Sequence, residues 1–192
     1  LDNDDLLLAV GGEAHLNSRV EPADASEQGV LWSTSNPDVA MVANGLVSGV
    51  ARGTAVITVT TVDGGYTATC AVTVRVPVSG ITVHPQYVSL LPGEQAQVAA
   101  EVVPEDASDS RVSWSSDNTA VANVTEAGLI IAANNSGTAT VTVTTVDGGF
   151  SAAVTVTVTT NPVTGVTISD NNRTLTEGES FTLSAHVEPL DA

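Results

Sequence analysis

Lysine is absent from this sequence of 192 residues, and basic residues of any kind are few. Five arginines stand against 22 acidic residues, which gives a formal net charge of −17. A surface this acidic repels phosphate groups, so it argues against binding to nucleic acid or to an anionic membrane surface. The absence of lysine also excludes a Lys–Asn or Lys–Asp isopeptide cross-link.

Cysteine, aromatic residues and long apolar runs are also scarce. The single cysteine, Cys70, excludes an intramolecular disulfide, and we interpret it as a small buried apolar residue. Aromatic residues make up only 3%, so the cores must be built from Val, Ala, Leu and Ile. No run reaches the roughly 20 apolar residues of a membrane helix. No signal peptide opens the chain either, and we expect an internal segment or a mature product.

The dominant feature that is present is a repeated segment. Residues 58–68 return almost letter for letter as residues 142–152, and each copy alternates apolar and Thr/Ser residues on both sides of an Asp-Gly pair. This alternation around Asp-Gly predicts a β-hairpin, with the Asp-Gly pair in the turn and glycine supplying a positive φ. The apolar faces of both arms are predicted to form one wall of a core.

Other cues mark three starting modules. A Gly-Glu pair at residues 12–13, 93–94 and 178–179 precedes an alternating strand that ends at Pro22, Pro104 or Pro189, because proline cannot donate to a ladder. We place the first module at 1–77, with an incomplete first strand, the second at 78–162 and a partial third at 163–192. The junctions are short and each holds a proline, so we expect a semi-rigid rod.

Each complete module holds one tryptophan, Trp32 or Trp114. Each follows a valine by two residues on the same strand face, and we predict that it forms the centre of a sandwich core. About eight short strands per module, with no helical periodicity, predict an all-β fold: tandem immunoglobulin-like β-sandwich modules arranged as a rod.

An ordered series of motifs carries a family resemblance. It runs through Gly-Ile-Thr-Val (80–83), Leu-Pro-Gly-Glu (91–94), Val-Ser-Trp-Ser-Ser-Asp-Asn (112–118) and Gly-Thr-Ala-Thr-Val-Thr-Val (137–143). The chain thereby resembles the bacterial Ig-like domain group 2 (BIG2). That resemblance implies tandem arrays in invasin-like and intimin-like surface proteins, in phage tail or capsid proteins, and on polysaccharide-acting enzymes.

The acidic clusters raise the possibility of calcium, which some members of the family are reported to bind. Asp2, Asn3, Asp4 and Asp5 could supply oxygen ligands, as could Asp106 with Asp109. The spacing does not match an EF-hand, and such clusters between strands are more often solvated turns. We therefore expect no metal site and no bound cofactor, with calcium as the open alternative.

Catalytic motifs are not found. His15, His84 and His186 occupy unrelated places in the repeat, and no nucleophile pair, phosphate loop or zinc spacing occurs. We predict no catalytic residue and no enzyme activity.

Carbohydrate binding is the rival hypothesis, as in an accessory module of a secreted polysaccharide-acting enzyme. Sugar platforms need exposed aromatic faces, and only Tyr87, with Tyr66 or Phe150 near the hairpin tips, is predicted to be exposed. Three N-glycosylation patterns begin at Asn123, Asn134 and Asn172, and in a bacterial protein such patterns are usually accidental.

The partial third module cannot bury enough surface to be stable alone, so its apolar residues need a cover. We expect residues 165–192 to pack on a neighbouring chain by strand complementation, or to belong to a longer array. The predicted function is a non-catalytic stalk and adhesion segment of a bacterial surface, extracellular filament or virion. Its predicted partners are a cell-surface protein or glycan, or further copies of the chain.

Overall fold

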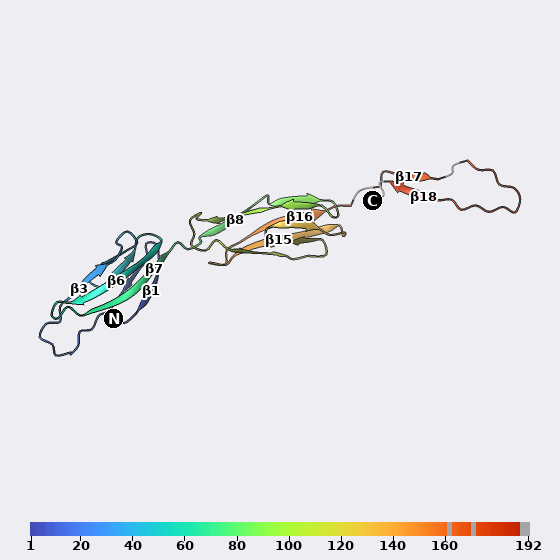
Figure 1. Cartoon of the computed structure of the whole chain (residues 1–192). Helices are drawn as coiled ribbons and strands as arrows, with labels where there is room; N and C mark the ends of the chain where they lie inside the picture. The colour runs from blue at the N-terminus through green and yellow to red at the C-terminus, as the bar shows by residue number, and fades with distance from the viewer. Residues whose placement is uncertain (161–162, 170–171, 189–192) are drawn as a thin grey trace. The chain divides into compact units, whose positions relative to one another are not determined.

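The computed structural model describes residues 1–160, 163–169 and 172–188, and all regular structure in these residues is β-strand (Figure 1). No helix in this part of the chain is long and apolar enough to cross a bilayer. The predicted all-β class is therefore confirmed.

The first repeat is a sandwich of two sheets. Its four-stranded sheet has the order β1-β7-β6-β3, and its three-stranded sheet has the order β2-β5-β4. Buried residues of both sheets share one apolar cluster, with Ala40, Val47, Ile57 and Cys70 fully buried. The strands are β1 (Asp5–Ala9), β2 (Glu13–His15), β3 (Val30–Thr34), β4 (Ala40–Ala43), β5 (Leu46–Gly49), β6 (Gly53–Thr61) and β7 (Thr67–Arg75).

The second repeat reproduces these two sheets and adds a strand pair. Its sheets have the orders β12-β15-β16-β9 and β10-β14-β13, and the added pair is β11-β8. The strands are β8 (Gly80–His84), β9 (Tyr87–Leu90), β10 (Gln95–Gln97), β11 (Ala99–Val103), β12 (Val112–Ser116), β13 (Ala122–Val124), β14 (Leu129–Ala132), β15 (Gly137–Thr145) and β16 (Ser151–Val158). Strand β8 has no counterpart among the described strands of the first repeat.

Both predicted hairpins form, with Val59 opposite Ala68 and Val143 opposite Ala152. The apolar faces are buried as the alternation predicts, because successive side chains of a strand point to opposite sides. Burying one such valine or isoleucine contributes roughly 1.5–3 kcal/mol. The buried residues are Ala55, Ile57, Val59, Cys70, Val72 and Val74 in the first hairpin, and Ala139, Val141, Val143, Val154, Val156 and Val158 in the second.

The hairpin tips are five-residue loops, longer than the Asp-Gly turn alone. In the first tip the hydroxyl of Thr61 donates to the carbonyl of Asp63 at 2.7 Å and accepts the backbone N–H of Tyr66 at 2.9 Å. Both glycines of the tip have positive φ, 75° at Gly64 and 66° at Gly65, which explains the Gly-Gly pair. The second tip has the same hydrogen bonds through Thr145.

The tryptophans correct a prediction. Trp32 packs against the core cluster, yet it is only half-buried, and so is Trp114. The reason is topological: β3 and β12 are the edge strands of their four-stranded sheets, so one side of each indole has no neighbouring strand. The centre of the first core is formed instead by Ile57, Val47 and Val72.

The third repeat is represented by one strand pair, β17 (Gly165–Ile168) with β18 (Ala185–Glu188). All eight residues are intermediate or exposed, and Phe181 and Leu183 precede β18 outside any described strand. The alternating strand that the sequence predicts after the Gly-Glu pair at residues 178–179 therefore begins only at Ala185. The apolar residues that were predicted to need a cover remain partly exposed, at 39% for Phe181 and 57% for Leu183.

By their contacts the described residues form two compact units. The first contains Leu1–Ile81, Glu101–Arg111 and Thr145–Phe150, and the second contains the other described residues. The predicted module limits and the rod-like arrangement stay predictions, and the junction at Pro162 and the strand end at Pro189 lie outside the described residues.

Candidate functional site

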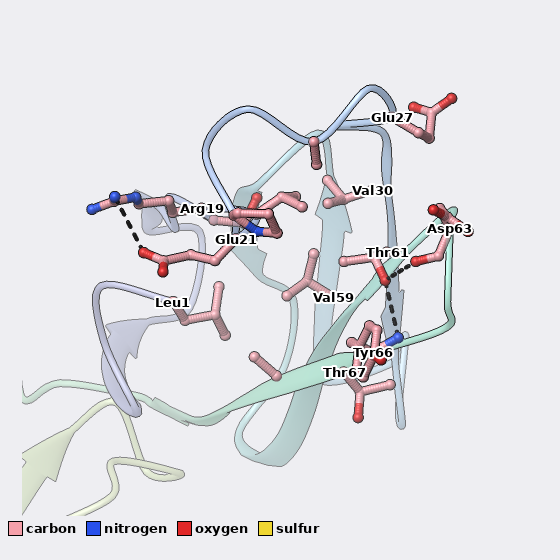
Figure 2. A pocket seen from close by; sticks show the side chains of 15 residues that line it. Leu1, Arg19, Glu21, Glu27, Val30, Val59, Thr61, Asp63, Tyr66 and Thr67 are labelled. Carbon is pink, nitrogen blue, oxygen red and sulfur yellow. Dashed lines mark hydrogen bonds and ion pairs between the residues drawn. The ribbon is translucent and has the colours of Figure 1, made fainter.

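A hollow of about 320 Å³ opens on the first repeat between the hairpin tip and residues 18–22. We call it the groove. Figure 2 shows Leu1, Val30 and Val59 at its floor, the ion pair of Arg19 and Glu21 at one rim, and the tip of the first hairpin at the other. Its floor is mostly apolar and its rims are polar, as in many ligand-binding clefts.

Residues 17–21 border this groove. They align with β11 of the second repeat, since Pro22 and Pro104 end the two stretches. Yet they belong to no strand of the described chain. A backbone hydrogen bond to the start of the described chain is found at one end of this stretch, where Asp2 donates its N–H to the carbonyl of Asn17 at 3.2 Å. Residues 17–21 thus align with a strand of the second repeat and are not assigned to a strand in the described chain.

In the second repeat the corresponding place is filled by the chain itself. Strand β8 pairs with β11, and Ser79 donates both its N–H and its hydroxyl to the carbonyl of Val103, at 2.7 and 3.1 Å. Val78 and Val83 are buried there, at 6% and 5% exposure. Leu1 holds the position that corresponds to Val83, so the groove of the first repeat begins where β8 would continue toward its N-terminal end.

The filled and open sites differ in burial at matching positions. Ala107 and Thr145 are buried in the second repeat, whereas their counterparts Ala25 and Thr61 are half-buried. At the hairpin tip, Phe150 is 38% exposed and Tyr66 is 77% exposed. These positions are therefore less exposed in the second repeat, where the linker and β8 cover them, than in the first.

The hairpin-tip carboxylates differ in the same way. Asp147 accepts the backbone N–H of Val78 at 3.0 Å and the guanidinium of Arg75 at 3.0 Å, all within the first compact unit. Ser108 fixes Val76 from both sides, since its hydroxyl accepts the N–H of Val76 at 2.9 Å and its own N–H donates to the carbonyl of Val76 at 2.8 Å. The matching carboxylate of the first repeat, Asp63, is exposed at the mouth of the groove.

Hydrogen bonds of this kind lower the pKa values of two carboxyl groups, those of Asp147 and Asp109. The N–H of Val78, and after it the guanidinium of Arg75, hold the pKa of Asp147 below its ordinary value. Hydrogen bonds from Arg111 lower the pKa of Asp109 to about 2. Charge-assisted hydrogen bonds favour the ionised carboxylate in both cases.

The predicted calcium ligands are already engaged in part. Asn17 donates both its backbone and its side-chain N–H to the carboxylate of Asp2, at 3.0 and 2.7 Å, and this lowers the pKa of Asp2. Asp109 forms its ion pair with Arg111 at 2.6 Å. Among the described residues no three His, Cys, Asp or Glu side chains come together as a metal cluster. The calcium hypothesis stays a prediction.

The remaining candidates are dispersed. Cys70 is fully buried, and burial raises the pKa of its thiol, which confirms its interpretation as a core residue. The three histidines, His15, His84 and His186, are all exposed, on separate strands. The asparagines that begin the three glycosylation patterns are exposed as well.

The partial exposure of the two tryptophans is the point that the sequence-based prediction missed. Tyr66 and Tyr87 are 77% and 78% exposed, as predicted. In addition, Trp32 lines a shallow hollow of about 330 Å³, together with His15, Leu16, Asn17, Ser18, Val30 and Asn44. A matching hollow of about 340 Å³ lies beside Trp114. The exposure of the tryptophans follows from the edge position of β3 and β12, which depends on strand order and cannot be read from the residues near each tryptophan.

Comparison with known proteins gives a family and a fold. The family model described as bacterial Ig-like domain (group 2) matches residues 1–72 and 77–156. The chain is similar to an Ig-like virion protein of Serratia phage KSP90, with 37% identity over 120 residues, covering 61% of this chain and 46% of that protein. It is also similar to an alpha-L-arabinofuranosidase of Bifidobacterium longum subsp. longum, with 45% identity over 74 residues, covering 38% of this chain and 7% of that protein.

Among solved structures, extracellular domains 3–5 of Drosophila OTK match with a TM-score of 0.52 at 18% identity, covering 83% of this chain and 61% of that one. This likeness shows the fold. The chain spans less than half the length of either curated relative. Since the family model covers most of both complete repeats, the chain is a structural module that belongs to the group 2 family of bacterial Ig-like domains.

Proposed function

We propose that this chain is a non-catalytic stalk and adhesion segment of a bacterial surface, filament or virion protein. The observation that carries the proposal is the anchored junction. Residues 75–78 are held by the carboxylate of Asp147 and by Ser108 through hydrogen bonds of 2.8–3.0 Å. A spacer must resist bending where one sandwich ends and the next begins, and anchoring the linker backbone serves that purpose.

The setting of the proposal comes from the relatives. Similarity to an Ig-like virion protein and membership of the group 2 family support an extracellular or virion location. The formal charge of −17 favours solubility. Adhesion would use loops and sheet edges, with a cell-surface protein or glycan, or another copy, as partner.

Small-angle X-ray scattering tests the stalk. We expect an elongated particle with a narrow distance distribution for the wild-type chain, and a broader distribution for Ser108→Ala combined with Asp147→Ala. Asp63→Ala is the matched control, because it removes the equivalent carboxylate without touching the junction. The measurement is made at the lowest practical concentration so that single chains are observed. A compact wild-type particle, or an unchanged distribution in the double variant, would contradict the stalk.

Adhesion needs its own measurement. Beads coated with the chain are expected to be retained on bacterial cells, and beads coated with an unrelated acidic protein of similar charge are not. Equal retention of both would show that charge alone, rather than this surface, is responsible.

Carbohydrate binding is a second candidate, favoured by the hollow beside Trp32 and by similarity to an arabinofuranosidase. A half-exposed indole next to amide and hydroxyl side chains is the kind of surface that stacks on a sugar ring. A glycan array should then show binding that Trp32→Ala or Tyr87→Ala abolishes. Binding that survives both substitutions, or no binding at all, would remove this candidate.

A further inference from the structure

We propose that the open edge of β12, together with the hollow beside Trp114, binds an extended segment of another protein that carries a lysine or an arginine. The segment adds to β12 as a further strand, and its basic side chain contacts the indole of Trp114 and the carboxylate of Glu126. This site goes beyond the stalk role and does not depend on it, because peptide binding to the chain can be measured whatever particle the chain belongs to.

Strand β12 has one edge that no other described strand covers. It ends the sheet order β12-β15-β16-β9, so β15 pairs with its other edge only. At the end of this pair the N–H of Asp117 donates to the carbonyl of Thr140 at 3.1 Å. Hydrogen-bonded positions alternate along an antiparallel ladder, so the backbone groups that point to the open edge are those of Val112, Trp114 and Ser116. A row of such groups is a template for an added strand.

The hollow of about 340 Å³ lies at the same edge. Val112 and Trp114 line it from β12, and Glu126 lines it from the turn between β13 and β14. The half-buried indole packs beside Gly128, where an added Cβ would lie 3.0 Å from Cζ2 of Trp114. The hollow therefore combines a partly exposed aromatic ring with a carboxylate.

Hydrogen bonds fix the turn that carries Glu126. The side-chain amide of Gln97 donates to the carbonyl of Ala127 at 2.8 Å, and the N–H of Leu129 donates to the hydroxyl of Thr125 at 3.1 Å. Glu126 is exposed, and its carboxylate takes part in none of the ion pairs of the described chain. A cation from a partner can therefore pair with it without displacing an existing contact.

The chemistry of the hollow selects a basic side chain. An ammonium or guanidinium group is attracted both by the face of an indole and by a carboxylate. An acidic side chain is repelled by a chain with a formal charge of −17. In strand addition the backbone hydrogen bonds supply affinity and the pockets for alternate side chains supply specificity. The hollow beside Trp114 thus specifies a lysine or arginine at one position of the added strand.

A second copy of this chain does not fit that requirement. The chain has no lysine, and of its five arginines only Arg75 lies in a described strand, where its guanidinium pairs with Asp147 at 3.0 Å. Two copies that each carry a formal charge of −17 also repel each other. The partner is therefore a different protein with a basic extended segment.

The first repeat supplies a natural comparison. Strand β3 is likewise at the end of its sheet order, and a hollow of about 330 Å³ lies beside Trp32. The residues that line this hollow in the described chain include no carboxylate, and Ala43 occupies the position that Glu126 has in the second repeat. The first repeat therefore has the edge and the indole without the acidic group.

Fluorescence anisotropy with labelled synthetic peptides tests the proposal. One short peptide alternates lysine with threonine, and a matched peptide alternates glutamate with threonine. At physiological ionic strength, which screens long-range attraction, the lysine peptide should bind saturably and the glutamate peptide should not. Methylation of alternate backbone nitrogens of the lysine peptide should abolish binding, because it removes the N–H groups that pair with the edge of β12.

Variants of the chain separate the two side-chain contacts. Glu126→Gln should weaken binding of the lysine peptide about two- to fivefold. Trp114→Ala should weaken it about tenfold or more. Glu105→Gln removes the same charge at an exposed position that lines neither hollow, and Trp32→Ala removes the indole of the first repeat, so both should retain most of the binding. In Trp32→Phe the only tryptophan is Trp114, and its emission should change when the peptide is added.

Circular dichroism checks that every variant retains the β-sandwich spectrum. A lysine peptide that does not bind overturns the proposal, as does equal binding of the methylated peptide. Wild-type affinity in Glu126→Gln overturns it as well, and this variant decides the matter if Trp114→Ala does not fold. Displacement of the bound peptide by a neutral oligosaccharide would assign the hollow to a sugar instead.

Discussion

The two repeats have equivalent cores and different ends. Ile57 and Val141 are both fully buried at matching positions, and so are Cys70 and Val154. At the end that carries the hairpin tip, Asp147 holds a linker while Asp63 faces an open groove. The comparison shows that each core is formed by contacts inside one repeat. The hairpin-tip end of the second repeat is instead completed by residues 75–78, which lie outside the strands that form its core.

The largest expected effect tests the core half of this comparison. Ile57→Ala should lower the free energy of unfolding by about 2–5 kcal/mol, because it leaves a cavity where a fully buried side chain stood. Val56→Ala, on the other face of the same strand at 42% exposure, is the control and should change little. Urea unfolding monitored by tryptophan fluorescence measures both. Similar losses for the two variants would mean that the faces of β6 are wrongly assigned.

The next effect concerns the two carboxylates. Asp147→Ala should speed hydrogen exchange at the amide of Val78 roughly tenfold, because it removes the acceptor of that N–H. Asp63→Ala should leave this amide unchanged, since among the described residues the side chain of Asp63 has no hydrogen bond to the linker. Protection of Val78 that is equal in both variants would break the distinction between the repeat ends.

Acid should act through the same contact. The pKa of Asp147 is lowered in the folded chain, so its contribution to stability is present above the ordinary value of 3.8 and is lost as the pH falls through the lower folded value. Between neutral pH and about pH 4 the amide of Val78 should therefore stay protected. Asp147→Asn should remove this acid dependence. An exchange rate in wild type that rises already near neutral pH would contradict the assignment.

A smaller effect is expected where the repeats carry different residues in matching core positions. Cys70→Val should change the free energy of unfolding by less than about 1.5 kcal/mol, because Val154 fills the same place in the second repeat. Cys70→Ser should cost about 1–3 kcal/mol, since it buries a hydroxyl. Thermal unfolding compares them. A valine variant that is less stable than the serine variant would refute the equivalence of the two positions.

The smallest effect is expected from calcium. Asp2 and Asp109 are already bound to Asn17 and Arg111, so melting temperatures in calcium and in chelator should differ by less than about one degree. A clear upward shift in calcium, lost in Asp2→Asn, would establish the calcium-binding alternative instead.

The sequence by itself determined the local part of the structure. Alternation of period two placed Ile57, Val59 and Val72 in the core, since one slip of register would have exposed every one of them. The Asp-Gly-Gly tips and the family could be read in the same way. All these features depend on residues a few positions apart or on repetition along the chain.

Only the tertiary structure decided the candidate site. Trp32 looked like a core residue, but its strand lies at a sheet edge, and strand order depends on contacts between distant segments. Asp147 looked like a turn residue, yet its carboxylate binds Val78, which lies 69 positions away in the chain. Residues 17–21 align with β11, yet they are not assigned to a strand in the described chain. A strand needs a neighbour for its hydrogen bonds, and which strands become neighbours is decided by the folded chain rather than by the strand's own residues.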